Sequence, residues 1–390
     1  MRLADRMTGI GSETAFEAAA RARSLEATGR RVIHLELGEP DFETPANVRA
    51  AAQRALDDGW THYGPPLGIP ALREAIAADA TARKGFRVSA DNVAVVPGGK
   101  PVMFFALLAL AQAGDEVVYP DPGFPIYESM ARYVGATAVP YAITQANDFR
   151  VDLDELERLV TPRARLLILN SPANPTGGVF TRDDVERVAA LVLRHPDLTV
   201  LADEIYGRIV HEGKHVSIAS LPGLAQRTIV LDGFSKTYAM TGWRLGYAIL
   251  PAELVDPFSK LIINSVSCVS SFSQVAAVEA LTGPQDDVDA MVREFRARRD
   301  LVVEGLNGIP GVECAVPAGA FYVFPRVSGT GMDGATFADR LLAERGVCVL
   351  SGTAFGRVGA GHVRISYAAS REHLAEAIGQ IAAFVAERAG

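Results

Sequence analysis

Short apolar runs recur along the middle of the 390-residue chain, and each is followed by polar or glycine-rich residues. The runs cover 93–96, 116–119, 166–169, 198–202 and 228–231, and segments of helical length, such as 102–113, lie between them. Apolar strands that alternate with helices are typical of a mostly parallel sheet with helices on both faces. The pattern therefore predicts an α/β fold built on a doubly wound sheet.

The N-terminal part has a different pattern. Thr14 and Glu17 have the spacing of a capping box, which predicts a helix from Thr14 to about residue 29. A short apolar strand is expected over 32–37. Thr44 and Pro45 are expected to open the next helix as its N-cap and its first residue.

The C-terminal part is expected to hold a long amphipathic helix over 288–306 and a strand over 362–367. The arginines expected on the solvated face of this helix are Arg293, Arg296, Arg298 and Arg299. Alternation in the strand places Val363, Ile365 and Tyr367 on one face and Arg364 on the other. We expect these elements to join the N-terminal segment in a small α/β domain, formed by 1–44 and 286–390, beside a large domain over 45–285.

Composition and charge narrow the class of protein. Hydrophobic residues make up 49% of the chain, and its net charge is -8 with a pI near 5.5. The acidic balance argues against nucleic acid as a partner, because phosphate backbones need clustered Lys and Arg. The longest apolar stretch, 102–111, is too short to span a bilayer, and the N-terminus has no apolar signal core. We therefore expect a cytoplasmic protein.

The three cysteines, Cys268, Cys314 and Cys348, are scattered along the chain. Their odd number and their lack of ligand spacing make a disulfide framework or a zinc site an unfavoured interpretation. No metal is expected.

Polar residues able to do chemistry follow three of the apolar runs. Asn174, then Asp203 with Tyr206, then Lys236 each come shortly after a different run. In a doubly wound sheet, ligands bind outside the carboxyl ends of the strands. Each residue alone has an ordinary structural explanation, such as a strand-end cap for Asp203 or core packing for Tyr206. Their shared position predicts one binding site.

Lys236 is the most informative of these residues. It lies in the stretch 231–247, LDGFSKTYAMTGWRLGY, whose aromatic content is unusual for a solvent-facing loop. A lysine can form an imine with a carbonyl compound if it is held unprotonated, and burial with a nearby cation such as Arg244 lowers its pKa. Arg244 also offers a planar set of donors for phosphate. The combination suggests pyridoxal phosphate.

A second phosphate signal follows the first apolar run. Gly98 and Gly99 precede an expected helix, where free backbone N–H groups and the helix dipole favour an anion. A pair of glycines alone is a weak signal. The next residue, Lys100, fits either a ligand contact or a solvated lysine at the start of the helix.

These motifs together resemble those of class I aminotransferases, the fold-type I enzymes that use pyridoxal phosphate. The closest likeness is to the prokaryotic aspartate aminotransferase branch. It rests on Ser235-Lys236 with 240–247, MTGWRLGY, and extends from about Gly38 to the C-terminal helix. One departure is Ala173, where many relatives carry His or Asn before Asn-Pro-Thr-Gly.

The resemblance implies roles for single residues. Lys236 would hold the cofactor as an imine and then act as general base at the substrate Cα and general acid at the cofactor. Asp203 would keep the pyridine nitrogen protonated, while Tyr206 and Asn174 would donate hydrogen bonds to the ring O3'. The other implied cofactor contacts are the loop of Gly99 and Lys100, the phosphate contacts Ser235 and Arg244, the stacked ring of Phe124, and Tyr63 across a homodimer interface. The implied substrate contacts are Arg364 and Gly38 at the α-carboxylate, Asn174, and Lys100 at a distal carboxylate.

The expected reaction is transfer of an amino group between an L-α-amino acid and a 2-oxo acid such as 2-oxoglutarate. A pyridoxal phosphate lyase, decarboxylase or oxidase would use the same core residues, so these alternatives stay open. Lys100 favours aspartate or glutamate, whereas Phe16 and Phe124 favour larger apolar side chains. The serine-rich segment 264–273 has no assigned contact.

Two alternatives belong to other classes. A non-catalytic regulator of this fold would be expected to carry a basic helix-turn-helix domain in front, whereas this acidic chain begins almost directly with the enzyme-like segment. A dinucleotide-dependent dehydrogenase is suggested by 329–334, GTGMDG, which matches a Gly-x-Gly-x-x-Gly fingerprint. The acidic residue expected about twenty positions later is missing from 347–352.

Overall fold

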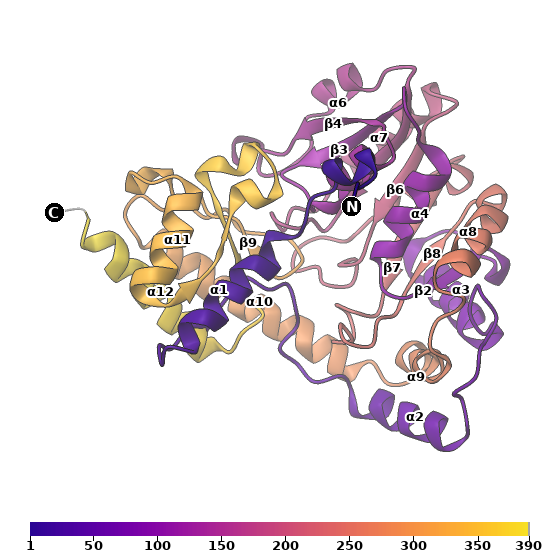
Figure 1. Cartoon of the computed structure of the whole chain (residues 1–390), viewed down its shortest axis with the longest axis horizontal. Coiled ribbons are helices and arrows are strands. Elements are labelled where there is room, and N and C mark those ends of the chain that lie inside the picture. Colours follow the sequence, from indigo (N-terminus) through magenta and orange to yellow (C-terminus); the bar gives the residue numbers. More distant parts are fainter. Residues whose placement is uncertain (389–390) are drawn as a thin grey trace.

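A seven-stranded sheet forms the centre of the computed structural model, which describes residues 1–388 (Figure 1). Its strands are β2 (Val93–Val96), β3 (Glu116–Asp121), β4 (Thr137–Ala142), β5 (Ala164–Asn170), β6 (Thr199–Asp203), β7 (Thr228–Gly233) and β8 (Gly246–Ile249), in the order β2-β8-β7-β6-β5-β3-β4. β8 is antiparallel to both neighbours, and the other pairs are parallel. β2 therefore points the same way as β7, and the predicted mostly parallel sheet is confirmed.

Helices cover both faces of this sheet. They are α2 (Ala46–Asp57), α3 (Pro70–Lys84), α4 (Lys100–Leu110), α5 (Ile126–Tyr133), α6 (Leu153–Leu159), α7 (Arg182–Arg194), α8 (Ala252–Ser265) and α9 (Ser271–Thr282). Successive residues of β6 face opposite cores: Val200 packs in one core with Val188 of α7, and Leu201 packs in another with Phe105 of α4. A strand buried on both faces carries a continuous apolar run, which is why β6 could be found in the sequence.

Segments from the N-terminal and C-terminal parts of the chain pack together on one side of the large sheet (Figure 1). β1 (Ile33–His34) pairs with β10 (Val347–Cys348), and β11 (Leu350–Ser351), β12 (Val363–Ser366) and β9 (Tyr322–Val323) form an antiparallel sheet. The helices beside them are α1 (Thr14–Glu26), α10 (Asp286–Asn307), α11 (Gly334–Arg345) and α12 (Arg371–Ala386). Val363, Ile365 and Tyr367 share one core, as their alternation predicted.

The predicted helix caps of α1 and α2 are wrong, although α1 begins at Thr14 as predicted. Thr14 is the first residue of α1 rather than its cap, and the carboxylate of Glu17 accepts a hydrogen bond from the Ser12 hydroxyl at 2.8 Å. Pro45, not Thr44, is the N-cap residue of α2. The Thr44 hydroxyl instead donates to the carbonyl of Ala239 at 2.6 Å. The Thr44 side chain, which suits a cap, is thus engaged by the loop that carries Lys236.

The prediction for the arginines of α10 is also partly wrong. Arg298 and Arg299 are buried rather than solvated. The Arg298 guanidinium lies 2.7 Å from Asp41 and 2.9 Å from Glu294, and that of Arg299 lies 2.9 Å from Glu212. Ion pairs with other segments allow these charged side chains to be buried, and periodicity along one helix does not reveal such partners.

The glycines of 329–334 have structural roles. The strand before them, β9, pairs antiparallel with β12, so the segment is not part of a parallel βαβ unit. Gly331 has φ +81°, and the Asp333 side chain caps α11 by accepting from the Thr336 N–H at 2.7 Å.

Within residues 1–388, no helix is long and apolar enough to cross a membrane.

Candidate active site

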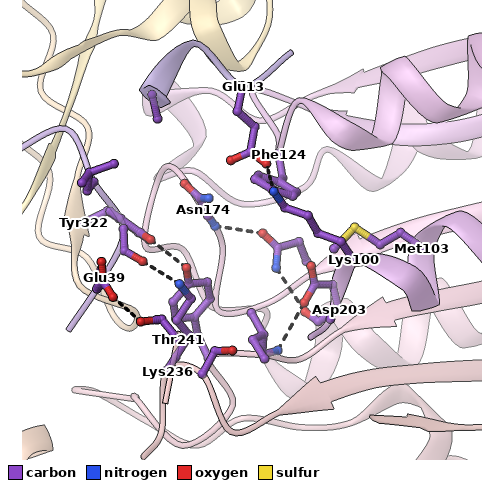
Figure 2. A pocket seen from close by; sticks show the side chains of 18 of the residues that line it. Glu13, Glu39, Lys100, Met103, Phe124, Asn174, Asp203, Lys236, Thr241 and Tyr322 are labelled. Atoms are coloured by element: carbon purple, nitrogen blue, oxygen red, sulfur yellow. Dashed lines mark hydrogen bonds and ion pairs between the residues drawn. The ribbon is translucent and has the colours of Figure 1, made fainter. Parts of the chain in front are cut away.

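A cavity of about 530 Å³ lies at the carboxyl ends of the parallel strands, between the large sheet and the C-terminal elements (Figure 2). Its lining contains the predicted site residues Gly38, Gly99, Lys100, Phe124, Asn174, Asp203, Tyr206, Ser235, Lys236, Arg244 and Arg364. Residues more than 300 positions apart in sequence thus meet in one place. Tyr63 lies outside this cavity.

Lys236 follows β7 and points its amine into the cavity. Its Nζ donates to the carbonyl of Gly38 at 2.5 Å. Burial lowers the pKa of Lys236 to about 8, and the positive charges of Arg364 and Arg244 act in the same direction. Glu39 opposes the shift. About a tenth of the molecules therefore carry an uncharged amine at pH 7, a far larger share than for a lysine with the ordinary pKa of 10.5, and the uncharged amine is the form that attacks as a nucleophile.

The loop that carries Lys236 is held by its own apolar residues and by the N-terminal segment. Phe234 and Tyr238 are buried in the core beneath it. Arg244 has φ +54°, a strained conformation for a residue with a side chain, and its Nη1 donates to the carbonyl of Thr241 at 2.7 Å. A Cβ on Gly98 would lie 2.3 Å from Arg244 Nη2. Glycine at position 98 therefore lets the guanidinium approach the backbone before α4.

Asp203 ends β6 and is 3% exposed. Its carboxylate accepts hydrogen bonds from the Tyr127 hydroxyl at 2.7 Å and from the Ile205 N–H at 3.3 Å. Burial raises the pKa of Asp203 to about 6, even though both hydrogen bonds favour the ionised form. A buried carboxylate of this kind is suited to a cationic partner.

Sequence reasoning missed Tyr127. Nothing in the local pattern distinguishes it from a core aromatic residue, because its partner Asp203 lies 76 positions away. The buried ion pairs of Lys84, which lie next to Asp203, were missed for the same reason, because the partners of Lys84 are far from it in sequence. Lys84 Nζ lies 2.7 Å from both Glu204 and Asp232, so one buried lysine forms ion pairs with two carboxylates next to the site.

Tyr206 and Asn174 reach the cavity from two neighbouring strand ends. The hydroxyl groups of Tyr206 and Tyr322 are 2.7 Å apart, and burial raises the pKa of Tyr206 well above its usual value. Tyr206 thus keeps a proton that it can donate. The backbone N–H of Asn174 donates to Asn170 Oδ1 at 2.8 Å, which fixes the loop after β5.

Arg364 enters from β12 and is 4% exposed. Its Nη1 donates to Asn174 Oδ1 at 3.1 Å, and its guanidinium lies 4.6 Å from the ring centroid of Tyr322. The pKa of Arg364 is lowered, mainly by burial. Within residues 1–388 its Nε has no hydrogen-bond partner. A buried guanidinium with unused donors in a cavity is a site for an anion.

Gly38 lies beside this arginine. A Cβ at position 38 would lie 2.1 Å from the Tyr322 hydroxyl, so the close approach requires glycine. The neighbouring Glu39 carboxylate accepts a hydrogen bond from the Thr241 hydroxyl (Figure 2). Tyr322 and Glu39 were not identified from the sequence, because each is positioned at the cavity by a contact with a distant segment.

Lys100 is the first residue of α4, and its ammonium forms an ion pair with Glu13 (Figure 2). It lies 5.8 Å from the ring centroid of Phe124, and the ring of Phe124 packs edge-on against Tyr127 with centroids 5.9 Å apart. Glu13 was not identified from the sequence, because it lies in an irregular N-terminal segment with no motif.

Tyr63 differs from the other predicted residues. Its side chain is 91% exposed. The adjoining residue is fixed by the serine-rich segment, since the Ser271 hydroxyl donates to the carbonyl of His62 at 2.7 Å. A single chain therefore does not bring Tyr63 to the cavity.

The sheet order, the discontinuous arrangement and the lysine-containing cavity define the chain as a fold-type I enzyme. Residues 30–381 match the family model for aminotransferase class I and II. The chain is 39% identical to an aspartate aminotransferase of Pyrococcus horikoshii, over 97% of this chain and 96% of that protein. It is 40% identical to an aspartate/prephenate aminotransferase of Cereibacter sphaeroides, over 98% of each. The chain belongs to the aminotransferase class I and II family.

The solved structures give the same result. The aspartate aminotransferase from Rhizobium meliloti superposes with a TM-score of 0.95 at 38% identity, covering 99% of each chain. An aromatic aminotransferase from Pyrococcus horikoshii superposes with a TM-score of 0.90 at 39% identity, covering 95% of this chain and 99% of that one. The predicted resemblance to the aspartate aminotransferase branch is confirmed, and the chain is an aminotransferase.

Proposed function

We propose that the cavity binds pyridoxal 5'-phosphate, carried by Lys236, and moves an amino group between an L-α-amino acid and a 2-oxo acid. The observation that carries the proposal is the Lys236 amine, which faces the cavity with a pKa lowered to about 8. Other residues of the cavity are proposed to bind the remaining parts of the cofactor.

The residues present fit this cofactor at both ends. At one end, the buried Asp203 carboxylate suits a protonated ring nitrogen. At the other, the N-terminus of α4 after Gly99 offers backbone N–H groups, with Ser235 and Arg244 close by in the lining. The glycine requirement at position 98 supports a phosphate site, because a side chain there would displace the Arg244 guanidinium. Phe124 offers an aromatic face between the two ends.

When bound, pyridoxal phosphate supplies an electron sink for the negative charge that develops at the substrate Cα. Arg364 fixes the α-carboxylate of the amino acid with its paired donors and so orients the Cα–H bond. The Lys236 amine, once free, takes the proton from Cα as general base. Asp203 would hold a proton at the ring nitrogen of the bound cofactor, and Tyr206 and Asn174 would donate hydrogen bonds to its ring O3'.

Aspartate or glutamate is proposed as one amino acid and 2-oxoglutarate as an acceptor. The support is the names of the relatives, several of which are aspartate aminotransferases, and the position of Lys100 in the cavity.

We also propose a cytoplasmic homodimer in which Tyr63 completes the partner's site. The exposure of Tyr63, 91%, supports this arrangement.

Absorbance spectroscopy tests the proposal. Wild-type protein given pyridoxal phosphate should develop a visible band, Lys236→Ala should not, and an effective amino acid should convert the visible band to the near-ultraviolet band of the aminated cofactor. Lys260→Ala is a suitable control, because Lys260 is 70% exposed and pairs with Asp256 on the same helix. Absence of a visible band in wild-type protein would refute the cofactor assignment. Release of ammonia and pyruvate without an aminated acceptor would identify a lyase instead.

A further inference from the structure

Glu13 and Lys100 form an ion pair in the wall of the cavity, although they belong to distant segments (Figure 2). Glu13 occupies the N-cap position of α1, yet its side chain makes no capping hydrogen bond to that helix. The side chain is 15% exposed and that of Lys100 is 46% exposed. Glu13 is therefore directed at the cavity lysine rather than at its own helix.

Two aromatic rings lie beside the ammonium of this pair. Lys100 Nζ is 5.7 Å from the ring centroid of Phe16 and 5.8 Å from that of Phe124, within the range of cation–π attraction. Both rings line the cavity. The first turn of α1 thus supplies an anion and a ring, and α4 supplies the cation between them. With the pair closed, this wall presents aromatic surface and a compensated charge.

The influence of Glu13 extends to the residues that are proposed to hold the substrate. Its negative charge raises the pKa of Lys236 and of Arg364, against the stronger lowering by burial. The Glu13 carboxylate thus acts on the same cationic side chains, Lys236 and Arg364, that a substrate carboxylate in the cavity would act on. Two carboxylates near one ammonium repel each other, so Glu13 and a second carboxylate compete for Lys100.

The 3₁₀ helix before Glu13 contributes no residue to a core. The 3₁₀ helix Asp5–Gly9 has no buried residue. Its connection to α5 includes a hydrogen bond from the Gly11 N–H to the Ser129 hydroxyl at 2.8 Å. Displacing the Glu13 carboxylate from Lys100 therefore does not require a buried residue of this preceding helix to move.

We propose that Glu13 is a specificity-determining residue that occupies Lys100 in place of a substrate's distal carboxylate. Aromatic and apolar amino acids enter while the Glu13–Lys100 pair is closed. Dicarboxylic amino acids reach Lys100 only after Glu13 has been displaced, so Glu13 lowers kcat/KM for aspartate and glutamate. The inference rests on the proposed amino-acid site and adds to it the selection between two classes of side chain.

Replacing Glu13 with glutamine tests this role. We expect the ratio of kcat/KM for glutamate to that for phenylalanine, measured with the same 2-oxo acid, to rise about two- to fivefold, since a competing, partly exposed ion pair is removed. Glu17→Gln is the matched control: it removes the same charge from the same helix, on an exposed side chain outside the cavity lining. That variant should keep the wild-type ratio.

A double-variant cycle shows whether the effect passes through Lys100. In a Lys100→Met background, Glu13→Gln should no longer favour glutamate. Titration with maleate, an unreactive dicarboxylate, gives a readout independent of turnover, and its Kd should fall about two- to fivefold in Glu13→Gln alone. An unchanged ratio and Kd in cofactor-loaded Glu13→Gln, or an equal gain without Lys100, would overturn the proposal. Failure of the proposed function is distinct, because no amino acid would then convert the visible band of wild-type protein.

Discussion

At the scale of single residues, the site depends on shifting the pKa values of buried groups in opposite directions. Burial lowers the pKa of Lys236 to about 8 and raises that of Asp203 to about 6, because in each case the low-dielectric surroundings disfavour the charged form. The same physical cause thus gives an amine that loses its proton more readily and a carboxylate that gains from a cationic partner. A ligand with a carbonyl carbon near Lys236 and a protonated nitrogen near Asp203 satisfies both groups.

The pKa of Lys236 leads to a pH prediction. Only the uncharged amine attacks the cofactor aldehyde, so the rate at which cofactor-free protein takes up pyridoxal phosphate should rise with pH and level off above about 8. An ordinary lysine, with a pKa of 10.5, would give a rate that keeps rising over this range. Stopped-flow measurement of the visible band follows the reaction, with an acetylated lysine amide as the reference. A rate that still rises in proportion to hydroxide above pH 9 would contradict the assigned pKa.

At the scale of elements, strand ends and the turns after them decide what reaches the cavity. The loop between β2 and α4 is one example, because Gly98 has φ +85° and faces the Arg244 guanidinium. Backbone and arginine approach each other there more closely than any side chain at position 98 permits. The proposed phosphate site therefore depends on a turn as much as on charged groups.

Substitution of Gly98 by alanine should weaken cofactor binding. Its Cβ would lie 2.3 Å from Arg244 Nη2, so the arginine or the loop has to move. We expect the Kd for pyridoxal phosphate to rise by about 10- to 100-fold, which corresponds to a strain of roughly 1–3 kcal/mol. Gly114→Ala is the control, since Gly114 has a similar φ of +96° but nothing within 4 Å of its Cβ position. Equal affinities of the two variants for pyridoxal phosphate would show that cofactor binding does not depend on Gly98.

The same elements show what the sequence could reveal. β2 was predicted at its observed bounds, and β5, β6 and β7 were found within a few residues, because strands buried on both faces give continuous apolar runs. Side chains that follow those runs, such as Asp203 and Lys236, could be placed at one edge of the sheet. Glu13, Tyr127 and Tyr322 could not, since each contributes through a contact across the tertiary structure. The burial of Arg298 was not predicted for the same reason, because its partner Asp41 lies 257 positions away.

At the scale of the whole molecule, both ends of the chain and the long middle segment contribute to one cavity. Gly38 and Arg364 approach from the N-terminal and C-terminal segments, and Lys236 from the large sheet. The domain limits, 45–285 against 1–44 with 286–390, stay a prediction. One predicted residue, Tyr63, remains outside this arrangement and is 91% exposed on a loop that Ser271 holds through His62. A second subunit is the proposed means of bringing Tyr63 to a phosphate.

Mixed dimers test whether Tyr63 acts across a subunit interface. Tyr63→Phe should raise the Kd for pyridoxal phosphate about tenfold or more, because a hydrogen bond to a charged group is lost. Lys236→Ala forms no visible band but keeps its own Tyr63. In a hybrid of the two variants, the site with Lys236 receives the partner subunit's Tyr63, so that half of the sites should recover wild-type affinity. A hybrid of Lys236→Ala with wild-type protein gives the reference amplitude. If Tyr63 served its own subunit, the hybrid would bind the cofactor as weakly as Tyr63→Phe does, and the shared-site dimer would be wrong even with the aminotransferase activity intact.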